Sequence, residues 1–115
     1  SYKLINVSSN IPICLQIAHA GRKGSSHIPW VKRNASLGKN SSSWKTFSAS
    51  KIKKDKGWPI PEALSHKQIK NIVLDYCHTI RLAKKIGFEC IEIHMAHGYL
   101  LHQFLSPISN KRKDA

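Results

Sequence analysis

The sequence is poor in acidic residues: six Asp and Glu stand against 19 Lys and Arg, which gives a formal net charge of +13. It is also poor in cysteine. Cys14, Cys77 and Cys90 are odd in number and widely spaced, so neither a disulfide framework nor a zinc knuckle is expected. These thiols predict a reducing compartment, and because no signal peptide is recognisable we expect a cytoplasmic location. No apolar run approaches the ~20 residues of a membrane span, so no membrane partner is expected.

The positive charge is spread along the chain rather than gathered in one place. Most of the basic residues are lysines, and their densest run covers only residues 51–56. Nucleic-acid-binding proteins usually show Arg-rich or clustered basic faces with interleaved aromatic residues. A lysine-rich solvated surface is therefore favoured, and no nucleic-acid partner is expected. A basic module that binds nucleic acid or another anion stays open as the alternative.

Four segments predict alternating strands and helices. Residues 11–18 and 88–94 are short and apolar with β-branched side chains, which is typical of buried strands, whereas residues 65–86 and 100–105 have helical spacing. A β–α–β–α order builds parallel sheets. Two strands cannot bury a core alone, so the chain is predicted to be part of an α/β domain, either a barrel or a doubly wound sheet. The barrel is favoured because no G-x-G-x-x-G loop follows a strand.

The first helix carries start and stop signals. Ser65 is a candidate N-cap, Gln68 completes a capping box with it, and Gly87 ends the helix. Its apolar stripe comprises Ile69, Ile72, Val73, Tyr76, Ile80, Ala83 and Ile86. The segment 24–57 is rich in Ser and Lys but contains three tryptophan or phenylalanine residues, which predicts a packed loop rather than a flexible linker.

Polar side chains that can take part in catalysis follow the two predicted strands. Gln16 lies near the end of the first strand, and His94, His97 and Tyr99 follow the second. Active sites of parallel α/β domains lie at this edge. Two imidazoles there can donate hydrogen bonds to an oxygen that becomes negative during a reaction, and a phenol can act as a general acid.

Structural roles are the alternative for each of these residues. Alone, either His94 or His97 can simply cap the end of the strand or hydrogen-bond a backbone carbonyl. His102, inside the second helix, is expected to be structural. A zinc site at His94 and His97 is also open, although the Glu of the His-Glu-x-x-His motif is absent between them. The sequence therefore predicts no metal ligands. We expect the three cysteines to pack as small apolar side chains.

Four stretches resemble the Old Yellow Enzyme family, flavin-dependent NAD(P)H oxidoreductases that reduce activated alkenes. The similarity is to the xenobiotic reductase-like branch, described as NADH:flavin oxidoreductase / NADH oxidase. The stretches are LQIAHAGRK (15–23), GWPIP (57–61), IEIHMAHGYLLHQFLSP (91–107) and SNKRKD (109–114). The long third stretch makes the resemblance specific, and similarity covers nearly all of the chain from Ile11 onward.

The resemblance implies a (β/α)₈ TIM barrel that binds FMN at its C-terminal face, with NAD(P)H as reductant. It implies that Gln16 contacts the flavin ring and that His94 and His97 bind the carbonyl oxygen of an α,β-unsaturated substrate or a related xenobiotic. Tyr99 matches the family's proton donor. The small-molecule substrate is reduced at its C=C bond, and a homo-oligomer is typical of the family.

The same resemblance predicts what the chain contains of the barrel. Residues 1–115 are expected to be an internal fragment of about two βα units, a partial FMN-binding domain of the NADH:flavin oxidoreductase / NADH oxidase type truncated at both ends. The family's first flavin-binding strand is expected before Ser1, and its flavin-binding arginines are expected after Ala115.

Overall fold

The computed structural model describes residues 11–38 and 42–114, and the chain divides into two compact units. The first unit comprises Ser1–Ile17 and His66–His94, and the second comprises Ala18–Ser65 and Met95–Ala115. Each unit is built from segments that are distant in the sequence.

The first unit contains the two predicted strands as a parallel pair. Strand β1 (Cys14–Ile17) lies beside β4 (Cys90–Ile93), with Cys14 opposite Cys90 and Ile17 opposite Ile93. The strand predictions are confirmed, although both strands are shorter than predicted. Most of their side chains are exposed, because a two-stranded sheet cannot cover both of its own faces. Cys14 and Cys90 are accordingly exposed rather than packed in a core.

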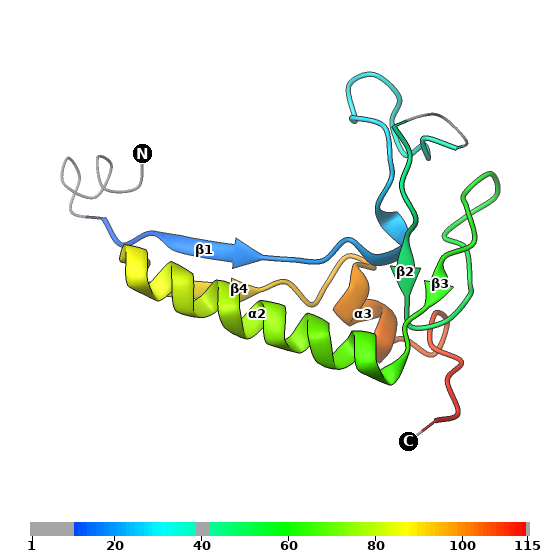
Figure 1. Cartoon of the computed structure of the whole chain (residues 1–115). Coiled ribbons are helices and arrows are strands. Elements are labelled where there is room, and N and C mark those ends of the chain that lie inside the picture. The colour runs from blue at the N-terminus through cyan, green and yellow to red at the C-terminus, as the bar shows by residue number, and fades with distance from the viewer. Residues whose placement is uncertain (1–10, 39–41, 115) are drawn as a thin grey trace. The chain divides into compact units, whose positions relative to one another are not determined.

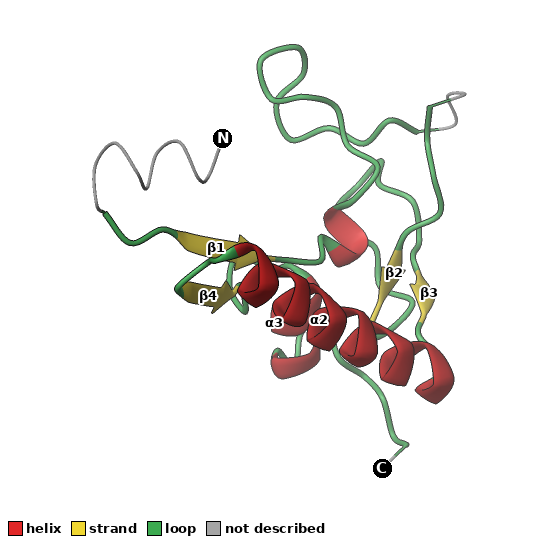
Figure 2. Ribbon diagram, turned by 60° about the vertical axis from the view of Figure 1, so that its left-hand side comes forward, coloured by secondary structure: helices red, strands yellow, loops and turns green. Residues whose placement is uncertain are grey.

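Helix α2 (His66–Ile86) runs beside this pair (Figures 1 and 2) and confirms the predicted helix. Its end is a Schellman motif, in which the Gly87 N–H donates to the Lys84 carbonyl at 3.1 Å and the Phe88 N–H donates to the Ala83 carbonyl at 3.0 Å. The middle of the predicted stripe is buried or half-buried, but Val73 is 55% exposed. Two strands offer too little surface to cover the whole apolar face.

The described residues of the second unit form four short elements. They are the 3-10 helix η1 (Gly21–Lys23), the strands β2 (Phe47–Ser48) and β3 (Glu62–Ala63), which pair in parallel, and the helix α3 (Leu100–Leu105). Both η1 and α3 contact β2. The predicted second helix is confirmed at α3. The predicted packing of the loop is wrong for two of its three aromatic residues, since Trp30 is 83% exposed and Trp44 is 59% exposed. The described part of the loop includes an antiparallel bridge between Ser26 and Ser36.

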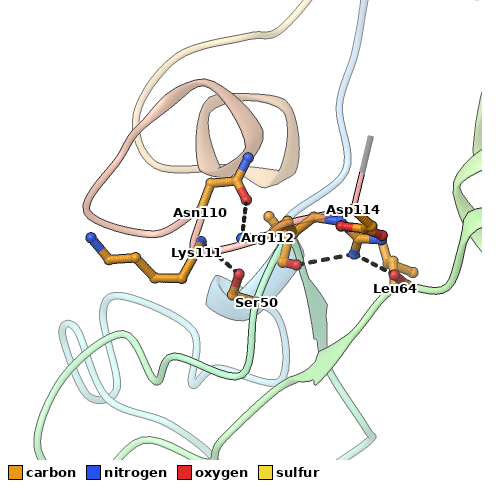
Figure 3. A network of polar contacts seen from close by, with 7 residues as sticks. Ser50, Leu64, Asn110, Lys111, Arg112 and Asp114 are labelled. Carbon is orange, nitrogen blue, oxygen red and sulfur yellow. Dashed lines mark hydrogen bonds and ion pairs between the residues drawn. The ribbon is translucent and has the colours of Figure 1, made fainter.

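Arg112 holds the C-terminal segment of this unit against the β2–β3 pair (Figure 3). Its guanidinium donates hydrogen bonds to the carbonyls of Ala49 and Leu64 and pairs with Asp114. The neighbouring Lys111 N–H donates to the Ser50 hydroxyl at 2.8 Å. Ala49 is completely buried and Leu64 nearly so, which places this network over the core of the unit.

No helix within the described part of the chain is long and apolar enough to cross a bilayer.

Candidate functional site

Gln16 is oriented by a carboxylate on the neighbouring strand. Its Nε2 donates to Oε1 of Glu92 at 2.6 Å, and the two residues are opposite each other in the β1–β4 register. Glu92 was not among the candidate residues. The sign of it in the sequence was an acidic side chain inside an otherwise apolar strand, at a position that a simple alternation of buried and exposed residues does not explain.

His94 follows β4 directly and is only 8% exposed. Its backbone N–H donates to the carbonyl of Ile17, the last residue of β1, at 3.0 Å, which continues the ladder by one residue beyond β4. Strand alternation places positions 92 and 94 on one side of the pair, the side that also carries Gln16. The first unit therefore gathers an amide, a carboxylate and an imidazole at the C-terminal end of its parallel strands.

His97 and Tyr99 are presented by a tight turn in the second unit. The Tyr99 N–H donates to the Ala96 carbonyl at 3.2 Å, and both central residues have positive φ, +56° at His97 and +71° at Gly98. Positive φ at both central positions is the signature of a type I′ turn. Tyr99 then occupies the N-cap position of α3. The turn thus places His97 and Tyr99 on either side of a glycine.

Lys23 fixes this turn from η1. Its Nζ donates to the His97 carbonyl at 2.5 Å and lies 5.3 Å from the centroid of the Tyr99 ring. The cation therefore contacts both the backbone of one candidate residue and the ring of the other. Lys23 was not predicted as a site residue. Its only signal was its position as the last residue of the family-like stretch 15–23.

Gln103 links the two loops that carry these side chains. It is 1% exposed; its Nε2 donates to the Gly98 carbonyl at 2.7 Å, and its Oε1 accepts from the Ser48 hydroxyl at 2.8 Å. Oε1 also lies 3.3 Å from the backbone N–H of Arg22. One buried amide thus connects α3 to η1, to β2 and to the turn. Its only sign in the sequence was a polar residue in an apolar helical segment.

His102 has the structural role that was predicted. Its Nδ1 accepts a hydrogen bond from the Gly98 N–H at 2.8 Å, one turn earlier in the chain. The imidazole therefore supports the turn beside His97 and Tyr99.

His19 is held neutral by its surroundings. Its Nδ1 accepts a hydrogen bond from the Gly21 N–H at 3.0 Å, and burial lowers the pKa of the imidazole below its usual 6.5. Because the unfolded chain takes up this proton first, stability should be greatest above pH 6.5 and should fall as the pH drops below it. The acceptor at Nδ1 leaves the remaining proton on Nε2.

We expect the free energy of unfolding to decrease between pH 7.5 and pH 5.5, and this decrease should be smaller in His19→Asn. Asparagine keeps an acceptor for the N–H two residues on but does not titrate. Urea unfolding of both proteins at the two pH values measures the difference. An identical pH dependence in wild type and variant would show that His19 does not contribute to it.

The four candidate residues divide between the units: Gln16 and His94 lie in the first, His97 and Tyr99 in the second. Across residues 11–38 and 42–114, no group of three His, Cys, Asp or Glu side chains is placed to hold a metal ion. The chemistry that the described residues do offer is hydrogen-bond donation by imidazoles and proton transfer by a phenol.

Comparison with known sequences identifies a single family over most of the chain. The profile of the NADH:flavin oxidoreductase / NADH oxidase family matches residues 8–115. An NADH:flavin oxidoreductase of Gibberella zeae is 42% identical over 110 residues, covering 93% of this chain and 27% of the relative. An NADPH dehydrogenase of Listeria innocua is 41% identical over 108 residues, covering 87% of this chain and 25% of the relative. The chain thus spans about a quarter of the length of these relatives.

Comparison with solved structures gives the same result for the fold. Morphinone reductase superposes with a TM-score of 0.73 at 25% identity, over 94% of this chain and 30% of that chain. Its complex with tetrahydroNAD superposes with a TM-score of 0.75 at 24% identity, over 94% and 31%. The predicted fold, an internal fragment of a TIM barrel, is confirmed.

Proposed function

Because this chain belongs to the NADH:flavin oxidoreductase / NADH oxidase family, which includes the Old Yellow Enzymes, we propose that the polypeptide carrying it is an ene-reductase. The family uses FMN as its cofactor and NAD(P)H as its reductant, as predicted from the sequence. The proposed reaction is reduction of the C=C bond of an α,β-unsaturated carbonyl compound or a related small xenobiotic. Residues 1–115 would form one part of the FMN-binding barrel domain.

The chemistry of Gln16 fits a flavin. Its amide offers both a donor and an acceptor, which is what the pyrimidine edge of an isoalloxazine ring requires. Nε2 has two hydrogens and gives one to Glu92. Within the described part of the chain, Oε1 accepts no hydrogen bond that would block an incoming N–H. Glu92 would then fix the orientation of the amide toward FMN.

His94 and His97 would bind the substrate carbonyl oxygen. Two N–H donors directed at one oxygen stabilise the negative charge that develops there when the β-carbon is reduced. When bound, FMN would supply the hydride that passes from NAD(P)H to the substrate. Tyr99 would hold the proton at its phenolic oxygen and donate it to the α-carbon.

The observation that supports this assignment most strongly is the Ala96–Tyr99 turn. Its positive φ angles place His97 and Tyr99 on either side of Gly98 at the start of α3, and Lys23, His102 and Gln103 all hold its backbone. A turn fixed by three side chains presents its flanking imidazole and phenol in a reproducible geometry, which proton transfer requires.

We expect Tyr99→Phe in the complete polypeptide to slow alkene reduction by about 10²- to 10⁴-fold, the range for loss of a general acid. Flavin reduction by NADPH should be unchanged, because that half-reaction needs no proton from Tyr99. Stopped-flow absorbance measures the two half-reactions separately.

Tyr76→Phe is the matched control, since it removes a phenolic hydroxyl on α2 that has no hydrogen-bond partner among the described residues. It should leave both half-reactions unchanged. Equal alkene reduction by Tyr99→Phe and wild type would remove Tyr99 from the proposed role. A complete polypeptide that is colourless when purified and shows no flavin absorbance after FMN is added would refute the proposed function as a whole.

A further inference from the structure

The second unit contains a small cationic hollow beside Tyr99. Its volume is about 190 Å³, and it is formed by η1, by the loop after η1, by the loop before β3 and by Tyr99. The side chains that matter here are those of Lys23, His27, Asn34, Lys54, Trp58 and Tyr99. Every residue of the hollow belongs to the same unit.

Positive charge converges on this hollow, and the carboxylate of Asp55, next to Lys54 in the chain, does not line it. Lys23 and Lys54 both line it, and none of the described lining residues is Asp or Glu. Burial lowers the pKa of the Lys54 ammonium, and the charges of Lys23 and Arg22 lower it further, whereas Asp55 acts in the opposite direction. Two like charges held near each other at a partly desolvated site are unfavourable until an anion joins them.

Both lysines are held in place by neutral partners. Lys54 Nζ donates to the Asn34 side-chain oxygen and lies 4.2 Å from the centroid of the Trp58 ring. Lys23 Nζ is held by the His97 carbonyl and by the Tyr99 ring. These contacts fix the direction of each ammonium group but neutralise no charge. Each ammonium also retains hydrogens for a further acceptor.

The size of the hollow limits what can enter it. At about 30 Å³ per water molecule, its volume corresponds to roughly six waters. Pockets that enclose whole small-molecule ligands usually have volumes of about 300–1,000 Å³. A single oxyanion group with its remaining waters therefore fits, whereas a complete dinucleotide does not.

We propose that this hollow, between Lys23 and Lys54 beside Tyr99, binds a phosphate or carboxylate group of a ligand whose remainder lies outside it. Two ligands of the proposed enzyme carry such groups: the nicotinamide dinucleotide, with its phosphates, and a substrate that bears a carboxylate. The assignment of these ligands rests on the proposed function. The convergence of Lys23 and Lys54 on the hollow is independent of the proposed function.

The first experiment uses inorganic phosphate as the probe and needs no enzyme activity. Phosphate is titrated into the complete polypeptide at constant ionic strength, and binding is followed by calorimetry. We expect saturable binding that Lys54→Gln weakens about tenfold, because it removes a charge-assisted hydrogen bond. Lys56→Gln, an exposed lysine two residues along the same loop that does not line the hollow, should leave the affinity unchanged.

Absence of saturable binding would overturn the proposal. Equal weakening by Lys54→Gln and Lys56→Gln would also overturn it, since that result describes the general surface charge of a basic protein. Neither result depends on FMN. Failure of this proposal is therefore distinguishable from failure of the proposed function, which is tested by flavin content.

The second experiment identifies the ligand that supplies the anion. KM values of Lys54→Gln and Lys56→Gln are compared for NADPH, for NADH, for a neutral enone and for an enone with a carboxylate. A rise of about tenfold in Lys54→Gln for NADPH alone assigns the ribose phosphate, and a rise for both dinucleotides assigns the pyrophosphate. A rise for the carboxylate enone alone assigns the substrate. If none of these values changes, the hollow binds no ligand of this enzyme and the proposal is wrong.

Discussion

Gln103→Leu is expected to lower the free energy of unfolding by about 4 kcal/mol. Leucine matches the volume of glutamine but leaves the Ser48 hydroxyl, the Arg22 N–H and the Gly98 carbonyl without their partner. Each buried polar group left unsatisfied costs about 1–3 kcal/mol. The loss should appear as an earlier midpoint in urea denaturation of the complete polypeptide with an unchanged slope.

The same substitution should also affect the site. Without the amide, the Gly98 carbonyl loses its donor and the turn that presents His97 and Tyr99 loses one of its three supports. Gln68→Leu, the same change at the half-buried capping-box position at the start of α2, serves as the control and should cost only about 1 kcal/mol. Equal stability of Gln103→Leu and Gln68→Leu would contradict the view that Gln103 joins the loops of the second unit.

Gly21→Ala should destabilise the protein by about 3 kcal/mol, for two reasons that can be separated. An added Cβ would lie 2.5 Å from both Nε2 and Oε1 of Gln103, which is buried and cannot withdraw. The backbone is also left-handed at this position, with φ +60°. The left-handed conformation alone costs a residue other than glycine about 1–2 kcal/mol. Thermal or urea unfolding measures the total.

Gly38→Ala isolates the backbone cost. Gly38 has φ +64°, but an added Cβ there would have no atom of residues 11–38 or 42–114 within 4 Å. We expect it to lose only about 1 kcal/mol. In a Gln103→Ala background, which removes the clashing side chain, the cost of Gly21→Ala should fall to a similar value. If Gly21→Ala costs no more than Gly38→Ala in the wild-type background, the close approach of η1 to Gln103 is not a constraint on folding.

The elements that could be predicted from the sequence are those with a local signal. The helical spacing of residues 65–86 and the glycine that follows define α2, and short β-branched runs define β1 and β4. The strands β2 and β3 have only two residues each, too few for any period to show. Val73 shows the opposite error: its spacing is that of a buried stripe, but spacing does not reveal how much surface is available to cover it.

The candidate site was predictable only in part, for a related reason. His94, His97 and Tyr99 stand close together in the sequence, at a strand end where chemistry is expected. Gln103 and Lys23 act through contacts that span 55 to 81 residues, such as those from Gln103 to Ser48 and to Arg22. A single sequence carries no local record of such pairings. Glu92 lies between these cases, because its misfit in the strand was visible but its partner Gln16 was not.

We propose that the Gln16 amide contacts FMN and that His94, His97 and Tyr99 act on the bound substrate. An experimental structure of the complete polypeptide, crystallised with FMN and a phenol, tests it most directly. The Gln16 amide should lie within about 3.2 Å of the pyrimidine edge of the ring, and the imidazoles of His94 and His97 should both reach the phenol oxygen. A structure with FMN bound and these side chains directed away from it would contradict the claim.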